Sequence, residues 1–98
     1  MNEELLKILN KHNLFESLNK LNLGTLIEKI MPVFVTAVKN INESALKGDL
    51  ELNRKNRKIV ASCVDTLRLL EQEVDIECFE EEEFLRIKSL VVNGEEVL

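Results

Sequence analysis

Residues 25–46, TLIEKIMPVFVTAVKNINESAL, form the longest apolar run of the chain and contain its only proline. Six apolar side chains in this run recur at intervals of four and three positions, which is the spacing of a helix face packed against a partner. They are Ile27, Met31, Phe34, Val38, Ile41 and Ala45. Thr25 with Glu28 has the spacing of a capping box, and Gly48 can end a helix at positive φ. The sequence therefore predicts a helix over residues 25–47.

Pro32 lies inside this predicted helix, seven positions after Thr25. Its ring removes the backbone hydrogen bond to the carbonyl of Glu28 and crowds that turn. A proline can also begin a new helix at the first position. Because the apolar spacing continues in phase on both sides of Pro32, we expect one helix that is kinked there.

The first half of this helix carries more apolar surface than a helix packed on one side needs. Nine of the thirteen residues 26–38 are aliphatic, Met or Phe. A helix that is apolar nearly all round is buried on nearly all sides. Packing within the chain would explain this surface, but we expect it to bind a partner protein or a second copy, because twofold homo-oligomers are common. The residues predicted to bind the partner are Leu26, Ile30, Val33, Phe34 and Ala37.

Helical patterns also cover residues 2–21, with a break near residue 12, and residues 50–74 and 80–92. Asp49 can cap the helix over 50–74, and glutamates 80–83 suit the positive end of the last helix dipole. A competing interpretation of residues 84–98 is a β-hairpin with a turn at Asn93 and Gly94. We favour the helix, and we predict an all-α fold: a small four-helix bundle that forms one domain over residues 1–98 and can dimerise.

Length and charge exclude several classes of function. The 98 residues suit a single domain, and the net charge of −5 disfavours broad binding to nucleic acid or anionic membranes, which depends on lysine and arginine. No window approaches about 18 uncharged apolar residues, and the acidic N-terminus does not resemble a signal peptide. Cys63 and Cys78 do not make a disulfide framework. We therefore expect a cytoplasmic protein that does not contact membranes.

The sequence carries no catalytic or cofactor motif. His12 is the only histidine, and no nucleophile elbow, glycine-rich phosphate loop or HExxH motif is present. His12, Cys63 and Cys78 lack the paired spacing of a zinc site, and Cys63 falls on an apolar helix face. We therefore predict that the protein is not an enzyme, holds no cofactor or metal and takes no small-molecule substrate.

A basic run at residues 53–58 is the sharpest polar feature. Arg54, Lys55, Arg57 and Lys58 could grip phosphates, while Asn53 and Asn56 could read base edges. A solvated helix face explains the run more simply. The acidic residues 71–83 could instead pair with these cations, within the chain or between chains.

The function that we predict is a non-enzymatic helical module for protein–protein interaction. An adaptor, a chaperone-like binder or a regulatory subunit would each fit, with the apolar helix as the binding surface. One alternative is a nucleic-acid-associated regulator that uses the cations of residues 53–58. Another is an acidic decoy, in which residues 71–83 imitate a phosphate backbone and bind a basic partner.

Overall fold

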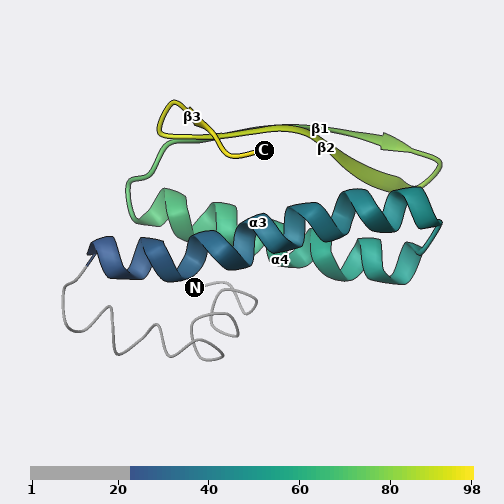
Figure 1. The fold of residues 1–98 in the computed structure, drawn as a ribbon, viewed down its shortest axis with the longest axis horizontal. Helices are drawn as coiled ribbons and strands as arrows, with labels where there is room; N and C mark the ends of the chain where they lie inside the picture. The colour runs from purple at the N-terminus through teal and green to yellow at the C-terminus, as the bar shows by residue number, and fades with distance from the viewer. Residues whose placement is uncertain (1–22) are drawn as a thin grey trace.

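Two antiparallel helices form one layer of the molecule, and a three-stranded sheet covers them on one side (Figure 1). The computed structural model describes residues 23–98. In chain order they form α3 (Leu23–Lys47), α4 (Leu50–Leu69), β1 (Val74–Glu81), β2 (Phe84–Val92) and β3 (Glu95–Glu96). The sheet is antiparallel, and β2 lies between β1 and β3. The described part of the chain is therefore an α+β fold.

The predicted all-α four-helix bundle is wrong, because the C-terminal part of the chain forms strands. The helix predicted over residues 80–92 is replaced by the end of β1, a turn and β2. The helix predicted over residues 50–74 ends at Leu69, and β1 begins at Val74. The competing hairpin interpretation holds, since Asn93 and Gly94 form the turn from β2 to β3 at φ of 52° and 82°. The helix predicted over residues 2–21, with its break near residue 12, lies outside the described residues.

The glutamates that were expected to open a helix form a turn instead. Glu82 and Glu83 lie between β1 and β2, with φ of 50° and 74°. A two-residue hairpin turn of this kind requires positive φ at both positions, which Asn, Asp and Gly normally supply. Glutamate pays a steric cost there, so no turn signal marks the position in the sequence.

The connection between the two helices follows from local capping. α3 runs unbroken through Pro32, and it is already helical at Leu23, the first described residue, so the start predicted at Thr25 was too late. Gly48 has φ of 73°, and the amide of Asp49 donates to the Ser44 carbonyl at 2.9 Å, which closes the last turn. The Asp49 side chain then accepts from the amide of Leu52 at 3.1 Å and begins α4. The predicted end of the first helix and start of the second are confirmed.

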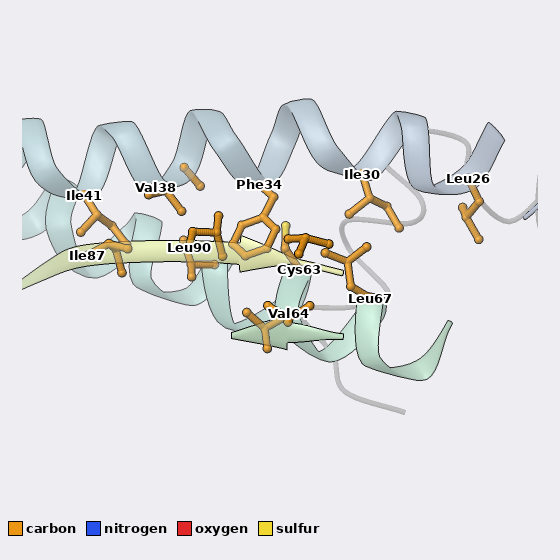
Figure 2. Packing of buried hydrophobic residues seen from close by; sticks show 14 residues of the cluster. Leu26, Ile30, Phe34, Val38, Ile41, Cys63, Val64, Leu67, Ile87 and Leu90 are labelled. Atoms are coloured by element: carbon orange, nitrogen blue, oxygen red, sulfur yellow. The ribbon is translucent and has the colours of Figure 1, made fainter. Parts of the chain in front are cut away.

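The hydrophobic core lies where α3 meets both α4 and β2 (Figure 2). α3 is therefore covered on two sides, which accounts for most of its apolar surplus. The fully buried side chains of α3 are joined by residues of α4 and of the sheet. They are Leu26, Ile30, Phe34, Ala37, Val38 and Ile41 from α3; Val60, Cys63, Val64 and Leu67 from α4; and Val74, Ile87, Leu90 and Val92 from the strands.

An irregularity in β2 keeps its apolar side chains on the helices. Glu77 pairs with Ser89, but the next residue of β1, Cys78, pairs with Ile87. The extra residue, Lys88, therefore belongs to β2 and forms a bulge, while β1 pairs without interruption. Because a bulge reverses the alternation of side chains, Ile87 and Leu90 are both buried against the helices although they lie three positions apart. β1 consequently remains a regular strand.

Candidate functional site

The residues predicted to bind a partner lie mostly in the chain's own interior. Leu26, Ile30, Phe34 and Ala37 are buried in the core, and Val33 is half-buried. Val33 lines an open groove of about 340 Å³ between α3 and α4, together with Pro32, Thr36, Ala37, Asn40, Asn56 and Ile59. Four of the five predicted residues are therefore occupied by packing within one copy of the chain.

The basic run at residues 53–58 is divided between surface and interior. Arg54, Lys55 and Lys58 are exposed, and Arg57 donates to the Glu80 carboxylate at 2.6 Å. This ion pair joins the basic run to the acidic one within the chain. The two asparagines of the run, by contrast, are buried at 0% and 4% exposure, so in this structure neither amide can read a base edge.

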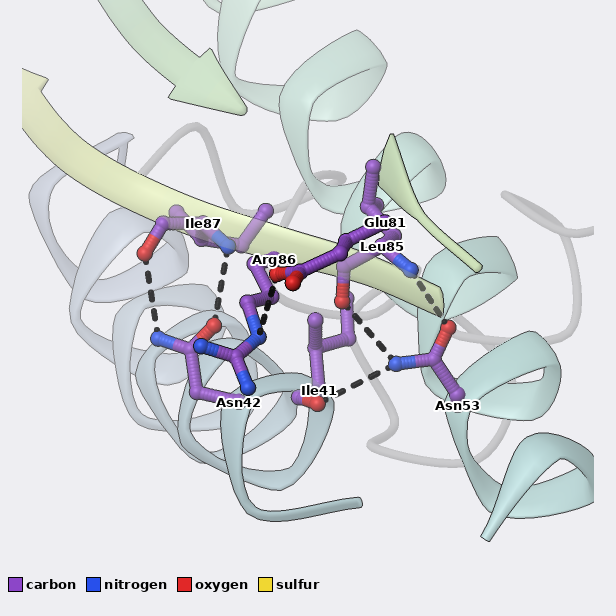
Figure 3. Close-up of polar contacts among 7 residues, drawn as sticks. All are labelled: Ile41, Asn42, Asn53, Glu81, Leu85, Arg86 and Ile87. Atoms are coloured by element: carbon purple, nitrogen blue, oxygen red, sulfur yellow. Dashed lines mark hydrogen bonds and ion pairs between the residues drawn. The ribbon is translucent and has the colours of Figure 1, made fainter. Parts of the chain in front are cut away.

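Asn53 joins both helices to the sheet through its side-chain amide (Figure 3). Its Nδ2 donates to the carbonyl of Leu85 at 3.0 Å, and its Oδ1 accepts from the amide of Leu85 at 2.9 Å. Nδ2 also donates to the carbonyl of Ile41 and to the hydroxyl of Ser44, each at 3.1 Å. The buried side chain is thus fully paired, as buried polar groups require.

Asn42 makes the same kind of contact two residues further along β2. Its Nδ2 donates to the carbonyl of Ile87 at 3.1 Å, and its Oδ1 accepts from the amide of Ile87 at 2.8 Å (Figure 3). Each asparagine therefore imitates the backbone of a neighbouring strand. Together Asn42 and Asn53 close the edge of β2 where β3 does not reach it. Sequence reasoning singled out Asn53 only as a possible reader of base edges, and it missed Asn42, although asparagine is a weak helix former and its position inside a helix is a signal.

The pairing of β2 fixes the direction of the β1 backbone groups. Leu85 and Ile87 turn their amides and carbonyls toward the asparagines, and the carbonyl of Leu90 accepts from the amide of Val97 at 2.9 Å. These groups therefore point away from β1. In an antiparallel ladder, two residues opposite each other either exchange hydrogen bonds or both turn outward. Their partners in β1 turn their backbone groups outward as well; these are Glu80, Cys78 and Ile76, in the same order.

The outer edge of β1 is open between two arginines of α4. Arg68 donates to the carbonyl of Val74 at 3.1 Å at one end, and Arg57 binds Glu80 through its side chain at the other. Among the described residues, the outward amides and carbonyls of Ile76, Cys78 and Glu80 have no hydrogen-bond partner. An unpaired strand edge of this length is a template for another strand.

The open edge is acidic and has one aromatic side chain. Asp75, Glu77, Glu80 and Glu81 are exposed, and the exposed fraction of Phe79 is 45%. The carboxylate of Glu81 approaches Arg86 at 4.0 Å, and the adjoining turn adds two more glutamates. The electrostatic potential along β1 is therefore negative, and Arg57, Arg68 and Arg86 offset part of it.

The chemistry-bearing residues do not converge in the described part of the chain. Burial raises the pKa of the Cys63 thiol to about 12, so this cysteine is not a nucleophile at neutral pH. Cys78 is exposed on the edge of β1, and both cysteines are free. Among residues 23–98, no group of three His, Cys, Asp or Glu side chains could hold a metal ion. His12 lies outside the described residues.

Comparisons with family models, with curated proteins and with solved structures give no significant match. In the same described residues, neither helix is long and apolar enough to cross a membrane.

Proposed function

We propose that this chain is a non-enzymatic module for protein–protein interaction that binds an extended segment of its partner as an added strand. The outward backbone groups of Ile76, Cys78 and Glu80, which have no partner among the described residues, support this proposal most directly. In strand addition, main-chain hydrogen bonds supply the affinity, and the neighbouring side chains supply the selectivity. An adaptor, a chaperone-like binder or a regulatory subunit can work in this way.

The contrast between the two edges of the β1–β2 hairpin supports β1 as the binding element. β2 is closed by Asn42 and Asn53, so a further strand cannot pair there without displacing them. The apolar face of α3 is largely buried in the core. The two free cysteines support the cytoplasm as the compartment, since thiols stay reduced there.

The proposal is tested with Cys78→Pro, using Cys78→Ala as the matched control. Proline has no amide hydrogen and is tolerated only at strand edges, whereas alanine removes the thiol but keeps the amide. Because the amide of Cys78 points away from β2, proline removes no ladder hydrogen bond. We therefore expect a folded protein whose edge cannot accept a strand.

Affinity purification from the source cells compares the wild type with both variants. We expect the wild type and Cys78→Ala to recover the same partners and Cys78→Pro to lose them. Circular dichroism should show that Cys78→Pro is folded. Recovery of the same partners with all three proteins would contradict strand addition at β1.

A further inference from the structure

We infer that the segment bound by β1 is basic: an extended peptide with lysine or arginine at alternate positions. This inference rests on the proposed function and adds the chemical class of the partner. A strand laid along β1 brings its side chains beside those of the edge, at cross-strand distance. The side chains of β1 therefore determine which sequences are accepted.

The outer face of the sheet is the acidic one. The side chain of Glu80 reaches Arg57 on α4, and Val74 is buried, so even-numbered residues of β1 face the helices. Because side chains alternate along a strand, the odd-numbered residues share the opposite face. They are Asp75, Glu77, Phe79 and Glu81, all of them exposed. On this face a bound strand thus lies beside three carboxylates and one phenyl ring. Its own side chains there are best suited as cations, with one apolar side chain beside the ring.

A second copy of the chain is a poor occupant of this edge. A twofold antiparallel pairing centred on Cys78 would place Asp75 of one copy opposite Glu81 of the other. It would also place Ile76 opposite Glu80, which would leave the Arg57 ion pair beside an apolar side chain. Like charges directly opposite each other in a ladder are destabilising. The acidic edge therefore opposes self-pairing and admits strands of opposite charge.

The edge is also regular enough to accept a continuous strand. Edge strands are often protected by a bulge that twists them away, but the bulge of this sheet, at Lys88, belongs to β2. Arg68 occupies the carbonyl of Val74 and so limits the open edge at that end. The turn at residues 82–83 limits it at the other end. The accepted segment is accordingly about as long as residues 75–81.

Three labelled synthetic peptides test the inference: alternating Lys and Val, alternating Thr and Val, and alternating Glu and Val, with blocked ends. Fluorescence anisotropy measures their binding to the wild type, to Cys78→Pro and to Cys78→Ala. Opposite-charge pairs across a ladder add affinity, so we expect the lysine peptide to bind about tenfold more tightly than the threonine peptide. We expect Cys78→Pro to lose this binding and Cys78→Ala to keep it.

A double charge reversal, Asp75→Lys with Glu77→Lys, leaves the backbone edge intact and tests the charge alone. We expect it to bind the glutamate peptide more tightly than the lysine peptide. An unchanged preference for the lysine peptide would overturn the inference.

Different results would overturn strand addition at β1 and the basic class of the bound segment. If the threonine or glutamate peptide binds the wild type as tightly as the lysine peptide, and Cys78→Pro weakens it, strand addition stands and the basic class is overturned. A dimer in light scattering that Cys78→Pro converts to a monomer also overturns the basic class, because a second copy then occupies the edge. If no peptide binds, or the lysine peptide binds equally well to Cys78→Pro, both proposals are overturned. If Cys78→Pro fails to fold, amide hydrogen exchange of the wild type replaces it. Strand addition then predicts that the lysine peptide slows exchange of the Ile76, Cys78 and Glu80 amides, and unchanged exchange would overturn both proposals.

Discussion

The two edges of the β1–β2 hairpin are treated in opposite ways. On the β2 side, Asn53 and Asn42 supply a substitute strand made of two side-chain amides (Figure 3). On the β1 side, Ile76, Cys78 and Glu80 keep outward backbone groups without a partner among the described residues. The closed edge fastens the sheet to the helices. On the open edge only the two ends are attached to α4, through Arg68 at Val74 and Arg57 at Glu80, and the backbone groups between them are left for a partner, which is why we assign function to that edge.

Replacing Asn53 should have the largest effect on stability. Asn53→Ala removes the side-chain hydrogen bonds to Ile41, Ser44 and Leu85 and leaves the partly buried amide and carbonyl of Leu85 unpaired, so we expect a loss of about 3 kcal/mol or more. Asn56→Ala is the matched control, because Asn56 is buried in the same helix but does not contact β2. We expect about 1 kcal/mol for the control. Urea denaturation measures both, and equal losses would show that Asn53 does not close the edge.

Asn42→Ala should destabilise the protein less than Asn53→Ala does. Asn42 makes two hydrogen bonds to Ile87 and is half-buried, so water can partly replace the lost contacts. We expect a loss of about 1–2 kcal/mol in urea denaturation. Asn40→Ala provides the control, since among the described residues the side chain of Asn40 makes one long contact, of 3.5 Å to Asn56. A control that is as destabilising as Asn42→Ala would contradict the role of Asn42.

The turn at Glu82 and Glu83, which joins β1 to β2, carries backbone strain that neither edge has. Replacing Glu82 by Asn and Glu83 by Gly gives the sequence that positive φ favours, so we expect a gain of about 1 kcal/mol in unfolding free energy. Gly94→Ala tests the same cost in reverse at the other turn. A Cβ at Gly94 meets no atom within 4 Å, so a loss of about 1 kcal/mol there reflects φ alone. No change from either substitution would contradict the account of the turns.

The helical hairpin could be predicted because its signals are ordinary ones. Gly48 and Asp49 end one helix and begin the next by rules that depend only on adjacent residues. The start predicted at Thr25 was too late, because the chain is already helical at Leu23, the first described residue. The apolar periodicity identified the packed face of α3 only in part. Phe34, Val38 and Ile41 are buried as predicted, but Ile27, Met31 and Ala45 are half-buried. Leu26, Ile30 and Ala37, which were assigned to a partner surface, lie in the core instead.

The β1–β2 hairpin could not be predicted because glutamates occupy positions where glycine or asparagine is the usual signal. Glu82 and Glu83 form one turn, and Glu71, with φ of 61°, closes the end of α4. A run of glutamates favours a helix start by the dipole rule, and this rule gave the wrong element. Only Asn93 and Gly94 marked a turn in the ordinary way. The candidate site depends on long-range pairing of Asn42 and Asn53 with β2, which no local pattern contains.

The prediction with the smallest effect concerns alkylation of the two cysteines, which measures accessibility and not stability. Cys78 lies on the open edge, whereas Cys63 is fully buried with its pKa raised to about 12. Iodoacetamide should therefore alkylate Cys78 in the native protein and leave Cys63 unmodified, with both reacting after denaturation. Mass spectrometry of peptides distinguishes the two sites. Equal modification of both cysteines in the native state would contradict the packing of α4.

The central claim is the difference between the closed and the open edge, and residue-resolved amide hydrogen exchange by NMR tests it most directly. We predict strong protection of the Leu85 and Ile87 amides, which the asparagines hold, comparable to that of Glu77 and Phe79 in the ladder. We predict rapid exchange for the amides of the open edge, which are those of Ile76, Cys78 and Glu80. Protection of Cys78 and Glu80 equal to that of Leu85 and Ile87 would contradict the account.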